Sequence, residues 1–141
     1  MSCTTRSDFK FEELLGESLK SSKVSRFIES EKLDKEVLKG LVTYNSEFIR
    51  LVFKKGKVSR IILKGFVSEE ISKWELPLDI RSTMTPSDIK SILNISKENE
   101  YVDEDEISFF YPSEKVSYRI RFNNKSLSYI YLDKKPGDDQ K

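Results

Sequence analysis

The chain has 141 residues, of which 25 are Lys or Arg and 24 are Asp or Glu, so its formal net charge is +1. This balance lacks the positive excess of a nonspecific nucleic-acid binder. The sequence contains no His and one Cys, and therefore lacks the usual general base, the commonest metal ligand and any internal disulfide. Its Phe, Tyr and Trp residues make up 11% of the chain, which is enough to build a packed interior, and the length favours one domain.

The two ends of the chain are polar. Residues 1–8 contain no apolar stretch typical of a secretory signal, and residues 134–141 are charged and turn-rich. We therefore expect flexible ends around one domain at 9–133, a cytoplasmic protein, and a free thiol at Cys3.

The first third of the chain is expected to be helical. A first helical segment is indicated by apolar residues at helical spacing: Phe11, Leu14, Leu15 and Leu19. A second helix is expected to begin with Ser22 as its N-cap and to carry an apolar stripe of Val24, Phe27 and Ile28. A third short helical segment is expected at 34–39, because Gly40 is typical of the residue that follows a helix.

A β-hairpin is expected next. The β-rich runs 47–53 and 58–63 flank the segment 54–57, in which Gly56 supplies the positive φ of a tight turn. A further strand is expected at 41–44. The number of residues in the turn decides which face Ile61 occupies, and the sequence leaves that number open.

The middle of the chain connects this hairpin to a helix with clear start signals. Residues 74–80 are expected to be extended, because Pro77 biases its predecessor away from the helix. Thr85 is the predicted N-cap of the following helix and Pro86 its first residue. Its buried stripe would be Ile89, Ile92 and Leu93. The chain then closes with an antiparallel meander of strands at 107–111, 116–122 and 127–132, with turns at 112–113 and 123–124.

An internal similarity suggests a repeated unit. Residues 48–63 align without gaps on 117–132, which places Phe53 on Phe122 and Ser59 on Ser128. Two unrelated amphipathic hairpins would share part of this pattern, but a helix also precedes each one. We therefore predict an α+β fold built from two tandem helix–antiparallel-hairpin units, at about 11–66 and 83–133. Together they would form a curved antiparallel sheet with helices packed on one face, the opposite face being open to solvent or a partner.

No catalytic motif is recognisable. The sequence has no G-x-S-x-G, S-x-x-K or Walker loop. Zinc would need several Cys or His ligands, and the acidic residues do not follow an EF-hand pattern. Paired carboxylates remain a formal possibility for glycosidase-like chemistry. We expect a non-enzymatic protein without a cofactor or metal.

The densest charge feature is the segment 98–106, which holds six acidic residues among nine. One interpretation is a solvated loop between the second helix and its strands. The other is an acidic docking surface for a basic protein, in which charge steers the encounter and aromatic residues anchor it. The candidate partner-binding residues are Glu98, Glu100, Tyr101, Asp103, Glu104, Asp105, Glu106 and Tyr111.

Two smaller features allow alternative interpretations. Lys54, Lys55 and Lys57 form a basic hairpin tip, which either protects against aggregation or, with Arg119, Arg121 and Tyr131, binds nucleic acid. Arg50 and Arg60 would extend that basic tip. Trp74 is either a core residue between the two units or an interface hot spot.

One stretch of the sequence resembles a known family. The run Leu76-Pro77-Leu78-Asp79-Ile80 followed by 82–94 is similar to the "LPLG…MT…V…LG" stretch of bacterial polymorphic-toxin immunity proteins, as found in contact-dependent or secretion-system effector immunity. The preceding residues 44–46 and 49–53 also resemble that group, so the match covers 44–94. The usual Gly after the helix is replaced by Asn94, which can also adopt the left-handed conformation. The tandem layout is more loosely similar to β-lactamase inhibitor proteins and to small outer-membrane assembly lipoproteins.

The resemblance implies a protein-binding inhibitor. We therefore predict an immunity protein whose partner is a cognate toxin domain, with the acidic segment and neighbouring aromatic residues occluding the toxin's active site. A nuclease toxin would present a suitable basic cleft, because its substrate is a polyanion. The alternatives are a nucleic-acid or nucleotide-binding module and an adaptor subunit without inhibitory role.

Overall fold

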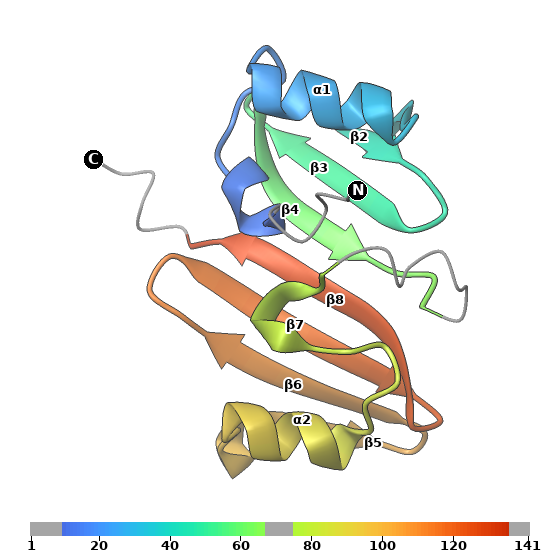
Figure 1. Cartoon of the computed structure of the whole chain (residues 1–141), viewed down its shortest axis with the longest axis vertical. Coiled ribbons are helices and arrows are strands. Elements are labelled where there is room, and N and C mark those ends of the chain that lie inside the picture. The colour runs from blue at the N-terminus through green and yellow to red at the C-terminus, as the bar shows by residue number, and fades with distance from the viewer. Residues whose placement is uncertain (1–9, 67–74, 136–141) are drawn as a thin grey trace, which may run out of the picture.

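The computed structural model describes residues 10–66 and 75–135. It has an α+β fold, in which an open, antiparallel sheet of eight strands combines with two α-helices (Figure 1). The strand order is β1-β2-β3-β4-β8-β7-β6-β5. Strands β1–β4 thus form one half of the sheet and β5–β8 the other, and β4 pairs with β8 where the halves meet. The α+β class expected from the sequence is confirmed.

Each half of the sheet follows one helix in the chain. The first half consists of α1 (Ser22–Ser30), β1 (Asp34–Leu38), β2 (Leu41–Asn45), β3 (Ile49–Lys54) and β4 (Lys57–Leu63). The second half consists of α2 (Pro86–Leu93), β5 (Glu100–Asp103), β6 (Glu106–Pro112), β7 (Val116–Asn123) and β8 (Ser126–Lys134).

Both α-helices begin at side-chain caps. Val24 N donates to Ser21 Oγ at 3.2 Å, so Ser21, and not Ser22 as expected, is the N-cap of α1, and Ser22 is its first residue. At α2, Asp88 N donates to Thr85 Oγ1 while Thr85 N donates to Asp88 Oδ2, which completes a capping box. Asn94 ends α2 with φ 54° and ψ 50°, the left-handed conformation expected of it.

The hairpin turns have the geometry that a twisted sheet favours. In the turns Lys39-Gly40, Lys55-Gly56 and Asn124-Lys125, both central residues have positive φ, as a type I′ turn requires. The β3–β4 pairing also shifts between Val52 and Phe53, and the β7–β8 pairing shifts between Arg121 and Phe122. The β3–β4 turn therefore has two residues, and Ile61 is fully buried.

The segment 34–39 is a strand rather than the expected helix. Asp34–Leu38 forms β1 and pairs along its whole length with β2. Gly40, with φ +83°, is the second turn residue of the β1–β2 hairpin and does not end a helix. The pairing is reinforced by Thr43 Oγ1, which donates to the Glu36 carbonyl at 2.9 Å. Tertiary pairing thus overrides a weak local preference.

The first helical segment is much shorter than expected. Only Phe11–Leu14 forms a 3-10 turn, and Gly16 then takes φ +84°. The following backbone is bonded to the start of β4, with Gly16 N donating to Val58 O and Val58 N donating to Glu17 O at 2.8 and 2.9 Å. These bonds hold the segment away from a helical path.

The expected extended segment at 74–80 contains a tight turn. Pro77–Asp79 forms a 3-10 turn in which Leu78 and Asp79 have positive φ, while Leu76 and Ile80 on either side are extended. Pro77 is buried. The expectation for Trp74 concerns a residue outside the described part of the chain.

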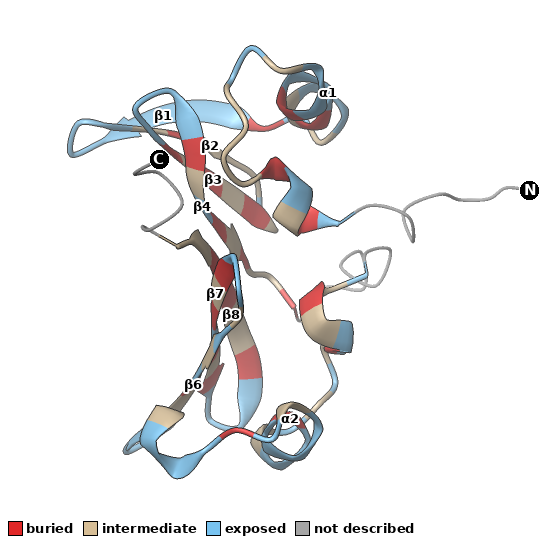
Figure 2. Cartoon of the chain, turned by 90° about the vertical axis from the view of Figure 1, so that its left-hand side faces the viewer, coloured by how far each residue is buried: buried red, intermediate tan, exposed pale blue. Residues whose placement is uncertain are grey.

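One hydrophobic cluster connects the two halves. It contains Val24 and Phe27 of α1, Ile89 of α2, and inward-facing strand residues such as Leu51 and Ile120. In Figure 2, α1 and α2 lie on the same side of the sheet. Neither is long and apolar enough to cross a membrane, and the same holds for the other helical turns at 10–66 and 75–135.

The opposite face of the sheet carries neither of the two α-helices of the described ranges (Figure 2). The 3-10 turn η5 (Lys97–Asn99) lies at the β5 edge of this face, where Glu98 and Asn99 line a hollow, and the ends of the sheet curve toward this face (Figure 2). Strand alternation divides the side chains accordingly: in β7, Val116, Tyr118, Ile120 and Phe122 are buried, whereas the residues between them are half-buried or exposed. This open face carries the candidate site.

Candidate functional site

The strand register places arginines and aromatic residues in one row across the open face. Arg119 on β7 pairs with Phe110 on β6 and with Tyr131 on β8. Tyr131 in turn pairs with Ile62 on β4, and Ile62 pairs with Arg50 on β3. Because directly paired residues project from the same side of a sheet, these five side chains line one face.

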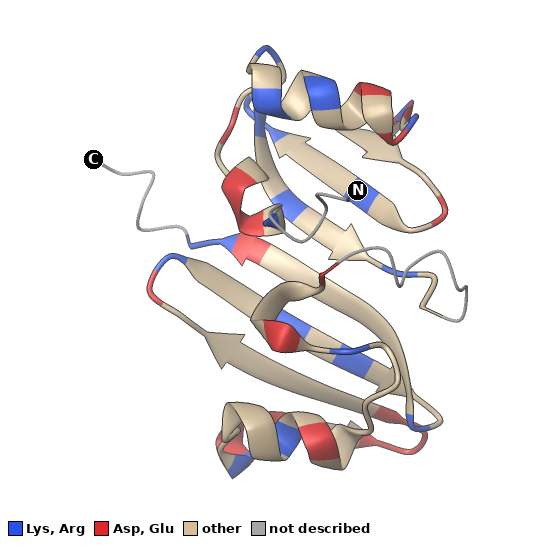
Figure 3. Ribbon diagram, viewed as in Figure 1, with Lys and Arg blue, Asp and Glu red and all other residues tan. Residues whose placement is uncertain are grey.

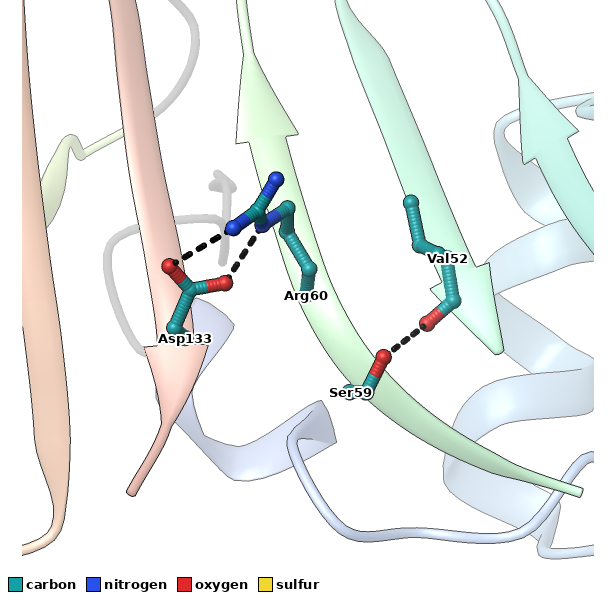
Figure 4. Close-up of polar contacts among 4 residues, drawn as sticks. All are labelled: Val52, Ser59, Arg60 and Asp133. Atoms are coloured by element: carbon teal, nitrogen blue, oxygen red, sulfur yellow. Dashed lines mark hydrogen bonds and ion pairs between the residues drawn. The ribbon is translucent and has the colours of Figure 1, made fainter. Parts of the chain in front are cut away.

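An ion pair lies beside this row, where the two halves of the sheet meet. Arg60 on β4 donates to Asp133 on β8 through Nε at 2.5 Å and Nη2 at 3.3 Å (Figure 4). These hydrogen bonds to Asp133 raise the pKa of Arg60. Its guanidinium also lies 5.5 Å from the centre of the Tyr131 ring, in cation–π range. Arg60 is therefore held in a defined position.

The bulge next to Arg60 is also fixed by a side chain. Val52 pairs with Arg60 and Phe53 with Val58, so Ser59 has no pairing partner on β3. The Ser59 hydroxyl donates to the Val52 carbonyl at 3.3 Å (Figure 4). This contact ties the extra residue of the bulge back to the neighbouring strand.

A second ion pair lies toward the β5 edge of the sheet. Arg121 Nε donates to Glu106 Oε2 at 2.7 Å. This bond lowers the pKa of the Glu106 carboxyl and raises the pKa of Arg121. Arg121 also pairs with Tyr129, whose ring lies 5.8 Å from that of Tyr131. The aromatic residues of β8 thus lie between the two ion pairs.

These side chains surround a hollow of about 650 Å³ on the open face. Its lining includes Tyr101, Phe110, Arg119, Arg121 and Tyr131. A second hollow, of about 510 Å³, is lined by the apolar residues Leu38, Leu41, Val52 and Ile62 and by charged residues that include Lys39, Arg50 and Lys54. Both hollows include Arg60 and Asp133, so they adjoin at that ion pair and form one surface.

The acidic segment 98–106 is an edge strand and a turn rather than the expected loop. Glu100–Asp103 forms β5, which pairs with β6 at the edge of the sheet. A two-residue turn of Glu104 and Asp105 connects the strands, and Figure 3 shows the acidic residues gathered at this end of the molecule. The sequence did not predict β5 because its acidic residues are typical of a loop, and the two β-forming residues Tyr101 and Val102 are too few to indicate a strand.

The predicted partner-binding residues fall into three groups. Glu98, Glu100, Tyr101 and Glu106 line the larger hollow. Asp103, Glu104 and Asp105 are exposed at the β5–β6 turn. Tyr111 is separate from both, since it pairs with the buried Tyr118, at 6.1 Å between ring centres, and packs against the core.

Two of the six acidic residues are already used within the protein. Glu106 is bonded to Arg121, and Glu100 forms an ion pair with Lys90 of α2 at 2.6 Å. Among the residues that the structure describes, Glu98 and the three acids of the β5–β6 turn form no ion pair. The free acidic charge is therefore concentrated at one rim of the open face.

The basic residues considered for nucleic-acid binding lie in two places. Lys54, Lys55 and Lys57 line a hollow at the β3–β4 turn together with Gly16 and Lys134. The second group, Arg119, Arg121 and Tyr131, lines the larger hollow of the open face. Figure 3 shows basic segments on β3, β4 and β7.

Sequence reasoning missed several residues of this face. The sequence pattern alone did not single out Phe110, Tyr129 or Asp133. The signal that could have found them is the alternation of β6, β7 and β8 combined with the strand order. That order brings β4 beside β8, a contact between strands far apart in the chain.

No group of three or more His, Cys, Asp and Glu residues in the described ranges is arranged to hold a metal ion. Comparisons with protein-family models, with curated proteins and with solved structures found no match to this chain. The site is therefore interpreted from its own geometry and from the sequence resemblance described above.

Proposed function

We propose that this chain is a non-enzymatic protein-binding inhibitor, an immunity protein that neutralises a cognate bacterial toxin. The observation that carries the proposal is the open sheet face, on which Arg60, Arg119, Arg121, Phe110 and Tyr131 surround one hollow. Arg and Tyr are among the residues that dominate binding energy at protein interfaces, and they do so in hollows that exclude water.

The charge distribution favours a protein over a nucleic acid as the partner. Arg60 and Arg121 are paired with Asp133 and Glu106 on the same face, so they are not free to neutralise phosphates. A groove for single-stranded nucleic acid combines positive charge along the backbone with stacking residues, and here Asp133 and Glu106 interrupt that positive charge. The mixed charges and aromatic residues of this face instead suit a protein surface.

The mechanism we propose is occlusion. The open face would cover the toxin's active site, while the acidic turn of Asp103, Glu104 and Asp105 would lie against the basic rim of a cleft that binds a polyanion. Opposite charges at the rim mainly accelerate association, and the central aromatic and arginine side chains slow dissociation. The inhibitory role itself rests on the resemblance of residues 44–94 to bacterial immunity proteins.

We also propose that the two halves are copies of one helix–meander unit, with the helices packed on one face of the sheet. The bulge at Phe53 and the bulge at Phe122 occupy equivalent places next to two-residue turns. The buried positions of β3 and β4 match those of β7 and β8 at a constant offset along the chain. This arrangement supports the internal alignment, and it leaves the second sheet face free for a partner.

The proposal is tested by affinity capture from the source organism with three tagged proteins. These are the wild type, the open-face double variant Phe110→Ala/Tyr131→Ala, and Ile92→Ala as a control on α2. Ile92 was expected in the buried stripe of α2 but is 52% exposed, and only Ile89 of that stripe is buried. Its truncation therefore removes an apolar side chain from a different surface. Bound proteins are identified by mass spectrometry, and the stoichiometry is measured with the purified partner.

The proposal predicts that the wild type and Ile92→Ala each bind a toxin domain one-to-one and that the double variant does not bind it. In an activity assay, the wild type should inhibit that toxin domain. Recovery of only nucleic acid or ribosomal proteins would contradict it. If the captured protein kept its activity when bound, this chain would be an adaptor rather than an inhibitor.

A further inference from the structure

Arg119 differs from the other arginines of the open face. Arg50 donates to Asn45 Oδ1, Arg60 to Asp133 and Arg121 to Glu106. Within the described ranges, the side chain of Arg119 forms no hydrogen bond or ion pair. It is nevertheless exposed in the larger hollow, between its strand neighbours Phe110 and Tyr131.

An unpaired guanidinium in such a place needs a partner once water leaves. Docking of a protein on this face would remove solvent from Arg119, and a buried charge without a counter-ion is strongly destabilising. The guanidinium presents several N–H donors in a planar fork that matches a carboxylate. The flanking rings would exclude water from that contact and strengthen it.

On the β5 side of the hollow the free charges have the opposite sign, whereas Arg50 and Lys64, which also form no ion pair among the described residues, line the adjoining surface with Tyr129 and Tyr131. Glu98 lines the hollow, and Asp103, Glu104 and Asp105 lie at the adjoining β5–β6 turn. The face therefore presents a free cation within its aromatic part and free carboxylates at its β5 rim. A partner surface of complementary charge would therefore have an acidic side chain at its centre and basic residues around it.

We propose that Arg119 receives a carboxylate of the toxin, one set within a basic cleft, and that this contact anchors the complex. The inference rests on the function proposed above and names the chemistry that its site recognises. A cleft of this kind is expected of an enzyme that acts on a polyanion, because basic residues bind the substrate and an acidic residue can serve as its general base. Arg119 would then block the reacting group as well as the cleft.

The test measures the dissociation constant between the captured toxin domain and Arg119 variants by calorimetry. Arg119→Ala should weaken binding by about 30-fold or more, the range of an interface hot spot. Arg119→Lys keeps the positive charge but lacks the planar fork of N–H donors. Its dissociation constant should therefore lie between those of the wild type and Arg119→Ala. The control is Arg26→Ala, an exposed position on α1, which should bind like the wild type. Thermal unfolding verifies that each variant is folded.

A double-mutant cycle identifies the partner group. Each carboxylate of the toxin cleft is replaced by its amide, and one such change should reduce the effect of Arg119→Ala to about threefold or less, because the contact is then already lost. If no carboxylate couples to Arg119, the proposal is wrong.

The outcomes separate this inference from the proposed function. If Arg119→Ala binds like the wild type while Phe110→Ala/Tyr131→Ala does not, the open face is the interface but Arg119 is not its anchor. If none of these variants alters binding, both proposals fail. A fluorescein-labelled single-stranded oligonucleotide provides the last comparison, since tight binding that is lost in Arg119→Ala would assign the residue to phosphate instead.

Discussion

At the scale of single residues, polar contacts at the margins of the core adjust its stability to pH. Tyr118 is buried on β7, and its hydroxyl donates to Glu12 Oε2 at 2.6 Å. Burial, followed by the hydrogen bond to Glu12, raises the pKa of Tyr118 above its ordinary value of 10.0. The contact connects the N-terminal 3-10 turn to the second half of the sheet.

We predict that Tyr118→Phe lowers the free energy of unfolding by about 1.5–3 kcal/mol near neutral pH, the usual contribution of a hydrogen bond to a charged group. Because the folded state holds the proton more tightly, the stabilising effect of the hydroxyl is complete below pH 10 and declines as the pH rises further. Urea unfolding of both proteins should therefore show a difference that shrinks above pH 10. Tyr101→Phe, on the exposed edge strand, should show no such difference at any pH.

The Arg121–Glu106 pair gives the opposite pH dependence. The pKa of Glu106 is lowered from 4.5 in the folded state, so the carboxylate stabilises the fold above that pH and the effect is lost as the pH falls below it. Glu106→Gln should be less stable than the wild type at pH 7, and the two should converge under acid conditions. Glu114→Gln, in the exposed β6–β7 turn, serves as the control. If the wild type remained more stable than Glu106→Gln by the same amount down to acid pH, the account would be contradicted.

At the scale of elements, local signals decide where α2 begins. The reciprocal bonds between Thr85 and Asp88 satisfy backbone N–H groups that would otherwise lack partners. We predict that Thr85→Ala lowers the free energy of unfolding by about 1 kcal/mol. The exposed Thr83 lies outside the capping box, so Thr83→Ala should have no measurable effect in the same denaturant titration. If the two substitutions lowered the free energy of unfolding equally, the loss of the cap could not be the cause.

The β5–β6 turn supports a prediction about binding. Replacing Asp103, Glu104 and Asp105 together by Asn, Gln and Asn removes the free acidic charge but leaves the bond between Arg121 and Glu106 intact. Association with the toxin should become slower and less dependent on salt, because charge at the rim acts mainly on the encounter. Stopped-flow association rates at two salt concentrations measure this, and unchanged rates would exclude the turn from the interface.

At the scale of the whole molecule, the sequence predicted the class of fold and most elements. The turn at Gly56, the cap at Thr85 and the left-handed Asn94 each depend on chemistry within a few residues, so they were recognisable. Strand β1 was missed because its residues, all exposed, show no alternation of apolar side chains. Strand β5 was missed because a charged edge strand resembles a loop.

The candidate site was only partly predictable for a related reason. Alternation within β7 separates Arg119 and Arg121 from the core, and those residues were noted. Their neighbours Tyr131 and Asp133, however, meet Arg60 only through the pairing of β4 with β8, which joins strands distant in sequence. A local sequence pattern contains no information about that pairing, so it indicated the acidic segment as the candidate site rather than the face beside it.

The central claim is that the open sheet face inhibits a toxin by covering it. The most direct measurement is growth of cells that produce the captured toxin domain together with the wild type, Phe110→Ala/Tyr131→Ala or Ile92→Ala, with all three proteins at equal levels. The account predicts that the wild type and Ile92→Ala restore growth and that the double variant does not. Full restoration by the double variant would contradict the account, because inhibition would then depend on another surface.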